Sequence, residues 1–206
     1  MRKRILAMFL ALVMTMALAA CKPAASQPTG APSQSGGEES AAPIDAPILA
    51  DFSAGAVEAF FASDGWSNGS VFNVTWKGDM VTYSDGQLHL GISDAKGEVE
   101  QGYYGGEART AHHYGYGEYS VSMKPAKVEG TASTFFTCTG NYDVGLDGSP
   151  NPWDEIDIEF LGKDTTGVQF NYFVDGQGGH EYWYDLGFDA SEEFHEYGFR
   201  WAEDSI

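Results

Sequence analysis

Basic residues are scarce in this sequence, and their scarcity limits the partners that the protein can bind. The chain has 11 lysines and arginines against 30 aspartates and glutamates, so its formal net charge at pH 7 is −19. A field of this sign repels nucleic acid and anionic membrane surfaces, and we expect neither as a partner. A neutral polymer is not repelled.

Cysteine is nearly absent as well, because Cys21 and Cys138 are the only two in 206 residues. If Cys21 is used in the way argued below, Cys138 has no partner within the chain. An exported domain without a disulfide depends on its apolar core. A chain of this length with 43% apolar residues can bury such a core.

The N-terminus has the features of a targeting segment. A basic stretch, residues 1–4, precedes the uncharged apolar run 5–20, which is short for a membrane-spanning helix. The tetrapeptide Leu18–Cys21 resembles a bacterial lipobox, in which cleavage before Cys21 is followed by attachment of lipid to its thiol. We expect residues 1–20 to be a lipoprotein signal peptide, and the protein to be exported and lipid-anchored at the cell surface. An ordinary signal peptide and a single membrane-spanning helix are the alternatives.

Residues 21–48 contain few of the side chains that a core needs. Proline, serine, alanine, glycine and glutamine dominate the segment, which predicts a flexible linker. The folded domain is then expected over residues 49–206. It shows no convincing helical periodicity, and turn signals recur about every ten residues. This pattern predicts an all-β fold, an antiparallel sandwich or jelly roll.

The stretch Trp153–Gly162 reads WDEIDIEFLG and places an acid at every second position. Successive side chains of a strand point to opposite faces, so Glu155, Asp157 and Glu159 share one face. The intervening isoleucines and Phe160 then face the core. Clustered like charges on a strand are unfavourable, which leads us to expect that these three acids have a function.

The spacing of the two glutamates suits a glycosidase. Their Cα atoms lie roughly 13 Å apart at about 3.3 Å per residue, which leaves about 5–7 Å between the carboxyl groups once the side chains lean together. Retaining glycosidases need about 5–5.5 Å. Mutual repulsion also separates the protonation steps of such a cluster. An acidic outer face and a calcium site are the alternatives; acids along a straight strand make a poor cage for calcium.

A longer set of motifs resembles one known family. The relevant stretches read "PWDEIDIEFLGKDTT", "DGWSNGSVFNVTW", "GGEART", "YGYGEYSVSMKPAK", "FFTCTG", "VQFNYF" and "DLGFDASEEFHEYGFRW". Together they cover roughly residues 60–206 and resemble the bacterial endo-β-1,3-1,4-glucanases, the lichenases, of glycoside hydrolase family sixteen. The resemblance implies a concanavalin-like β-jelly roll of two curved antiparallel sheets, with a β-glucan lying across the concave face.

The resemblance also implies roles for the three acids. Glu155 would be the nucleophile of a retaining endo-hydrolase, Glu159 the general acid/base, and Asp157 the assisting acid between them. No cofactor is required, a calcium ion would be structural, and the enzyme is expected to be a monomer. The unbroken Glu-Ile-Asp-Ile-Glu pattern argues against a laminarinase. Xyloglucan, a red-algal galactan, or carbohydrate binding without catalysis remain as alternatives.

Further residues match cleft positions of the family. These are Trp153, expected to stack on a sugar ring, and Asn73, Glu107, Arg109, Phe136 and Asn171. Strand alternation places Gln169 on the same face as Asn171, so we include it among the substrate-binding residues.

Three departures from the family pattern stand out. A disulfide found in many lichenases is replaced by Val74 and Gly105. Two cleft tyrosines are replaced by Cys138 and Phe173. The sequence also stops at Ile206, where family members continue with further strands and part of a calcium site. We therefore expect the domain to be incomplete at its C-terminus.

Overall fold

Strands form nearly all of the regular structure in the computed structural model, which describes residues 47–145 and 148–206. Two short 3-10 helices, η1 (Phe52–Ala54) and η2 (Gly78–Met80), are the only helices in those residues. The predicted all-β class is confirmed. In the same residues, no helix has the length and apolar character needed to cross a bilayer. The predicted signal peptide, Cys21 and nearly all of the predicted linker lie outside the described residues.

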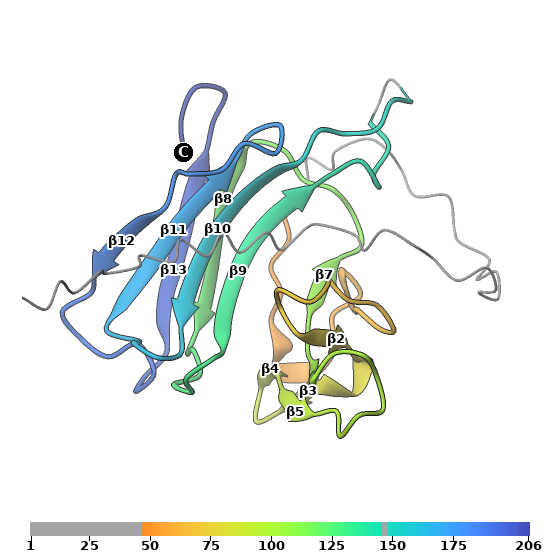
Figure 1. Cartoon of the computed structure of the whole chain (residues 1–206). Helices are drawn as coiled ribbons and strands as arrows, with labels where there is room; N and C mark the ends of the chain where they lie inside the picture. The colour runs from red at the N-terminus through yellow and green to blue at the C-terminus, as the bar shows by residue number, and fades with distance from the viewer. Residues whose placement is uncertain (1–46, 146–147) are drawn as a thin grey trace, which may run out of the picture.

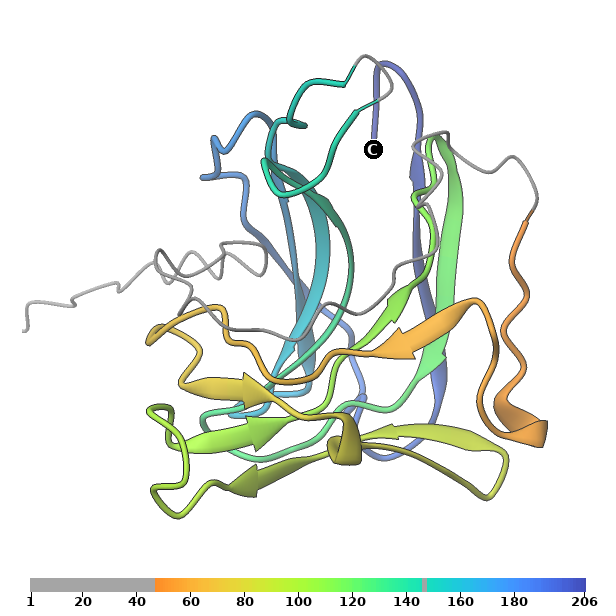
Figure 2. The same cartoon turned by 90° about the vertical axis from the view of Figure 1, so that its right-hand side faces the viewer.

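The largest sheet has four antiparallel strands in the spatial order β12, β11, β10 and β9 (Figure 1). Their bounds are Tyr182–Asp185, Gly167–Phe173, Asp154–Leu161 and Ala132–Thr139. A second layer is formed by β8 (Gly117–Met123) and β13 (His195–Trp201), which pair antiparallel. Figure 2 shows these two layers facing each other.

Shorter strands make up the rest of the fold, on one side of the four-stranded sheet (Figure 1). They are β1 (Phe60–Ala62), β2 (Val74–Trp76), β3 (Val81–Ser84), β4 (Gln87–Leu90), β5 (Ile92–Asp94), β6 (Tyr103–Gly105) and β7 (Ala108–Thr110). β1 pairs with β7, β3 with β4, and β6 lies between β2 and β5. The β2–β6 pair is parallel, unlike the antiparallel pairing that we expected.

The core lies between the two layers and is built by alternation along β10. Ile158 and Phe160 are fully buried, and Ile156 nearly so. They face the second layer, where Met123 of β8 and Phe199 of β13 pack against the same cluster. Full burial of each such side chain contributes about 1.5–3 kcal/mol. Because this face is committed to the core, the acids of β10 must point to the other side of the sheet.

The pairing of β10 is regular through the acidic motif. Glu155, Asp157 and Glu159 lie opposite Phe173, Asn171 and Gln169 of β11, with no residue skipped. On the other side, β10 pairs without interruption with β9 from Asp154 to Leu161. A bulge would place two residues opposite one. The expectation of an unbulged acidic strand is therefore confirmed.

Candidate active site

The three acids of β10 lie on one face of the four-stranded sheet, as the sequence predicts. Their exposed fractions are 2% for Glu155, 2% for Asp157 and 3% for Glu159. This burial differs from the open concave face that the family resemblance implies. It also sets the chemistry of the site, because burial disfavours the charged form of a carboxyl group.

Glu155 has hydrogen-bond donors suited to a carboxylate. The indole Nε1 of Trp153 donates to its Oε2 at 2.7 Å, and Asp157 is hydrogen-bonded to it as well. Trp153 is itself held by stacking on Phe173, with ring centroids 4.7 Å apart and planes 14° from parallel. Donors that favour the charged form of Glu155 make it the nucleophile candidate. Trp153 therefore lies beside the acids as predicted, and Phe173 supports its indole.

Asp157 is the group that keeps its proton. Burial is the main cause that raises its pKa to about 10, and the charges of Glu155 and Glu159 raise it further. A protonated carboxyl group can donate a hydrogen bond, and the hydrogen bond to Glu155 also raises the pKa of Asp157. The middle acid is thus a neutral hydrogen-bond donor to Glu155.

The pKa of Glu159 lies close to neutral pH. Burial raises its pKa to about 7, and the charge of Glu155 adds to that increase. Gln169 acts in the opposite direction, because its Nε2 donates to Glu159 Oε2 at 2.7 Å and stabilises the anion. A general acid works best when its pKa lies near the working pH. Glu159 is therefore the acid/base candidate.

Two predicted binding residues flank Asp157 on the neighbouring strands. Asn171 of β11 and Phe136 of β9 both lie directly opposite it. Asn171 is 3% exposed, yet neither its amide nitrogen nor its amide oxygen has a hydrogen-bond partner in the structure. Buried amides are rarely left unpaired in folded proteins. The hydroxyl groups of a sugar would supply both partners.

Glu107 directly precedes β7, and Arg109 lies within that strand. Glu107 is buried and accepts a hydrogen bond from the Ser63 hydroxyl. Burial raises the pKa of Glu107, while that hydrogen bond and the Arg109 charge lower it. The Arg109 guanidinium lies 5.7 Å from the Trp66 ring centroid. The contacts of this pair are compatible with packing as well as with sugar binding.

Asn73 has a structural use in the fold. Its side-chain oxygen accepts the backbone N–H of Gly102 at 2.7 Å, and its backbone oxygen accepts that of Tyr103 at 3.1 Å. Its φ of 52° lies in the left-handed region, which asparagine tolerates better than most residues. These contacts explain an asparagine here without a sugar, so substrate binding by Asn73 stays a prediction.

Sequence reasoning missed Tyr142, whose hydroxyl lies 3.3 Å from the Sγ of Cys138. Cys138 lies directly opposite Glu155 across the β9–β10 pair, so Tyr142 reaches the Glu155 end of the acidic face. The available signal was an aromatic residue in the segment between β9 and β10.

Cys138 is disulfide-bonded in the structure, which contradicts the expectation that it has no partner. The only other cysteine of the sequence is Cys21, outside the described residues.

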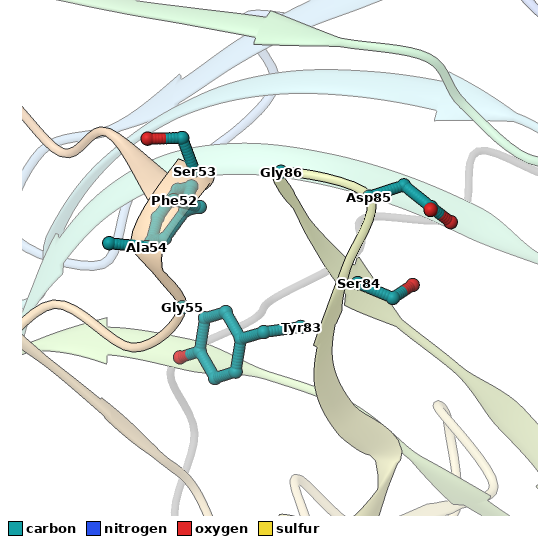
Figure 3. A pocket seen from close by; sticks show the side chains of 8 residues that line it. All are labelled: Phe52, Ser53, Ala54, Gly55, Tyr83, Ser84, Asp85 and Gly86. Atoms are coloured by element: carbon teal, nitrogen blue, oxygen red, sulfur yellow. The ribbon is translucent and has the colours of Figure 1, made fainter.

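A depression of about 250 Å³ lies elsewhere, between η1 and the turn that joins β3 to β4 (Figure 3). Residues 52–55 and 83–86 line it, and none of the β10 acids does. No group of three or more His, Cys, Asp or Glu side chains in residues 47–145 and 148–206 is arranged to hold a metal ion.

Comparisons with a family model and with curated proteins point to the same family. Residues 68–206 match the model of glycosyl hydrolases family 16. A β-glucanase of Brevibacillus brevis is 58% identical over 141 residues, which are 68% of this chain and 52% of that protein. A β-glucanase of Acetivibrio thermocellus is 49% identical over 168 residues, which are 82% of this chain and 48% of that protein. The chain thus spans about half the length of these curated relatives.

Solved structures agree with this result. A prokaryotic β-1,3-1,4-glucanase (lichenase) derived from a mouse hindgut metagenome has a TM-score of 0.68 and 49% identity, covering 75% of this chain and 69% of that one. The β-glucanase of Bacillus licheniformis has a TM-score of 0.66 and 42% identity over the same shares. A native glycosidic hydrolase has a TM-score of 0.73 and 49% identity, covering 79% and 71%. The predicted antiparallel jelly roll is confirmed.

Proposed function

The chain belongs to glycosyl hydrolases family 16, and from this premise we propose that it hydrolyses mixed-linkage β-1,3-1,4-glucan internally, with retention of anomeric configuration. One observation carries the proposal. The same strand face holds Glu155, which accepts a hydrogen bond from the Trp153 indole, and Glu159, whose carboxyl pKa is raised to about 7. The relatives named β-glucanase and lichenase support the substrate.

The reaction divides into two steps. Glu159 first donates its proton to the glycosidic oxygen while Glu155 attacks the anomeric carbon, so the leaving chain departs as an alcohol and a glycosyl ester forms on Glu155. Glu159, now ionised, then takes a proton from water, which attacks the same carbon and releases Glu155. Asp157 supports both steps by donating a hydrogen bond to Glu155.

Reducing-sugar release from barley β-glucan tests the chemistry. Glu155→Gln should lower the rate by at least about a hundredfold, because a neutral amide cannot act as the nucleophile. The exposed Glu193→Gln serves as the control with unchanged activity. Equal inactivity of the parent chain and Glu155→Gln, with both still retained in a β-glucan affinity gel, would instead establish a non-catalytic carbohydrate-binding domain.

Substrate choice is tested by comparing polysaccharides at equal mass concentration. We expect faster product release from barley β-glucan than from laminarin or xyloglucan, in line with the names of the relatives and with the regular pairing of β10. Equal or faster release from laminarin, xyloglucan or a red-algal galactan would overturn the proposed specificity while leaving the retaining mechanism in place.

We also propose that the protein is a monomer, exported and attached to the membrane by lipid at Cys21. The basic and apolar residues before Cys21 support this localisation. Intact mass measurement of the N-terminal peptide should show the added mass of lipid. An N-terminal peptide without lipid at Cys21 would overturn the proposed anchor.

Hydrolysis by carboxyl groups requires no cofactor, and a calcium ion would act on stability alone. Dialysis against EDTA should therefore leave the turnover of the folded protein unchanged at a temperature well below its melting point. A lower Tm after dialysis, restored by added calcium, would reveal a structural ion. Loss of turnover without any change in Tm would contradict the cofactor-free proposal.

A further inference from the structure

The loop that leads from β9 to β10 is fixed at its base by hydrogen bonds. The backbone N–H of Asp143 donates to Gly140 at 2.8 Å, and that of Asn151 donates to the Asp143 carbonyl at 3.0 Å. The Asn151 side chain also donates to the Thr139 hydroxyl at 2.8 Å. The segment from Gly140 to Asp143 is therefore held against the end of β9.

The side chain of Asp143 adds three contacts at the same place. One of its carboxylate oxygens accepts from the Thr139 hydroxyl at 3.2 Å and from the Gly140 N–H at 3.3 Å. The other lies 3.4 Å from Nε2 of His113, a residue from a distant part of the chain. This arrangement fixes the direction of the neighbouring residue, Tyr142.

Tyr142 is folded back over the end of β9. A Cβ added to Gly140 would lie 2.7 Å from a ring carbon of Tyr142, so only glycine leaves room for the ring. The hydroxyl then reaches the Sγ of Cys138. Cβ atoms of directly paired residues lie about 4.5–5.5 Å apart on the same face, which brings the hydroxyl close to Glu155, the partner of Cys138.

The charges around the Tyr142 hydroxyl agree with this position. The pKa of Tyr142 is raised to about 12, mainly by burial and by the charge of Asp143, with smaller increases from Glu155 and Glu107 and a decrease from Arg109. The hydroxyl is thus protonated at physiological pH and is influenced by the charges of Glu155, Glu107 and Arg109. The residue as a whole is 40% exposed, so its ring is accessible to a ligand.

We propose that Tyr142 is a substrate-positioning residue that binds a glucosyl unit at the Glu155 end of the site. Its hydroxyl donates to a sugar hydroxyl, its ring forms a wall against the pyranose face, and the Asp143–His113 contact holds it in place. The assignment deepens the proposed function and rests on it. Tyr142 takes no part in bond breaking, so its effect belongs to binding.

Calorimetry with a mixed-linkage glucan tetrasaccharide tests this role in the full chain carrying Glu159→Gln, which prevents turnover. In that background Tyr142→Ala should weaken binding about tenfold and Tyr142→Phe about threefold, as expected for loss of a ring contact and of one hydrogen bond. The matched control is Tyr184→Ala, because Tyr184 is 51% exposed and lies opposite the buried Val168, on the other face of the same sheet.

Kinetics on the chain with Glu159 intact distinguish a role of Tyr142 in positioning the substrate from a role in stabilising the fold. Tyr142→Ala should raise KM, while kcat stays within about twofold of the parent value and Tm is unchanged. The reason is that Tyr142 binds the ground state and the transition state equally, so its loss weakens binding without slowing the chemical step. A double-mutant cycle tests the Asp143–His113 contact that holds Tyr142 in place. His113→Ala should weaken tetrasaccharide binding when Tyr142 is present and have no further effect in the Tyr142→Ala variant.

The outcomes distinguish the two proposals. Binding by the parent that is unaffected by Tyr142→Ala overturns the role of Tyr142 and leaves the proposed function intact. Failure of the parent to bind or cleave any β-glucan overturns the proposed function, and the role of Tyr142 with it. Additive effects of His113→Ala and Tyr142→Ala would overturn the holding contact.

Discussion

Glu159 is the residue whose protonation governs the site near neutral pH. Its pKa of about 7 reflects mainly burial, moderated by the hydrogen bond from Gln169. The retaining reaction needs Glu159 protonated in its first step. We therefore expect kcat/KM to fall about tenfold per pH unit above about pH 7, because the alkaline limb reports the acid of the free enzyme. Initial rates on barley β-glucan from pH 5 to 9 measure this limb.

Gln169→Met gives a sharper test of the same assignment. Methionine preserves approximate volume but donates no hydrogen bond, so the ionised form of Glu159 loses stabilisation and its pKa should rise. The alkaline limb should consequently move to higher pH. A limb that stays in place in this variant, or moves to lower pH, would show that a group other than Glu159 sets it. A sequence alone could not have supplied this behaviour, because the shift arises from burial produced by the whole fold.

At the scale of the element, β10 joins the core and the site in one strand. Ile158 is fully buried in the core cluster, while the residues on either side of it carry the carboxyl groups. Ile158→Ala should lower the free energy of unfolding by about 2–5 kcal/mol, the usual cost of a core cavity. Ile92→Ala is the control, because Ile92 is 51% exposed. Urea denaturation measures both, and equal costs would contradict the assigned core.

Local pattern predicted the long strands well and the short ones less well. Alternation identified β8, β10 and β11, because each has one face in the core. The residues from Gln87 to Ile92 alternate in the sequence, but the strand breaks at Gly91. Its N–H donates to Met80 at 2.8 Å and its carbonyl accepts from Gly106 at 2.8 Å. These partners are distant in sequence, as are those of the parallel β2–β6 pair, so neither could be read from local periodicity.

In the site, too, the features set by local sequence were predictable, and those set by contacts distant in sequence were not. The shared face of Glu155, Asp157 and Glu159 follows from strand geometry alone. Mutual repulsion between the acids was also expected to separate their protonation steps, but burial, the larger cause of the raised pKa values, depends on the surrounding chain. Asn171 was placed on the correct face by alternation, whereas Tyr142 was missed because a loop has no period to follow. Residues on strands were thus predictable, and residues held by tertiary contacts were not.

For the whole molecule, the buried acids make stability depend on pH. Asp157 and Glu159 have folded-state pKa values raised above those of the unfolded chain, so the folded protein binds more protons. The stability associated with these protons is fully present below the unfolded pKa values, near 4, and is lost as pH rises through about 7 and toward 10. Asp189 acts oppositely, because hydrogen bonds, first from Lys127, lower its pKa. Its contribution is lost only as pH falls below 4.

Stability should therefore be greatest at mildly acidic pH and decline toward pH 9, and Asp157→Asn should reduce that decline. Asparagine cannot ionise, so at pH 8 the variant should be more stable by about 1–2 kcal/mol, or roughly 2–6 °C in Tm. Thermal melts from pH 4 to 9 measure how steeply Tm falls with pH.

Repulsion within a chain of net charge −19 would also weaken stability at high pH. Salt at about 0.5 M screens exposed charges far more than buried ones, so the difference between parent and variant should persist in salt. Parallel pH profiles for the two proteins would show that Asp157 is not the source of the decline.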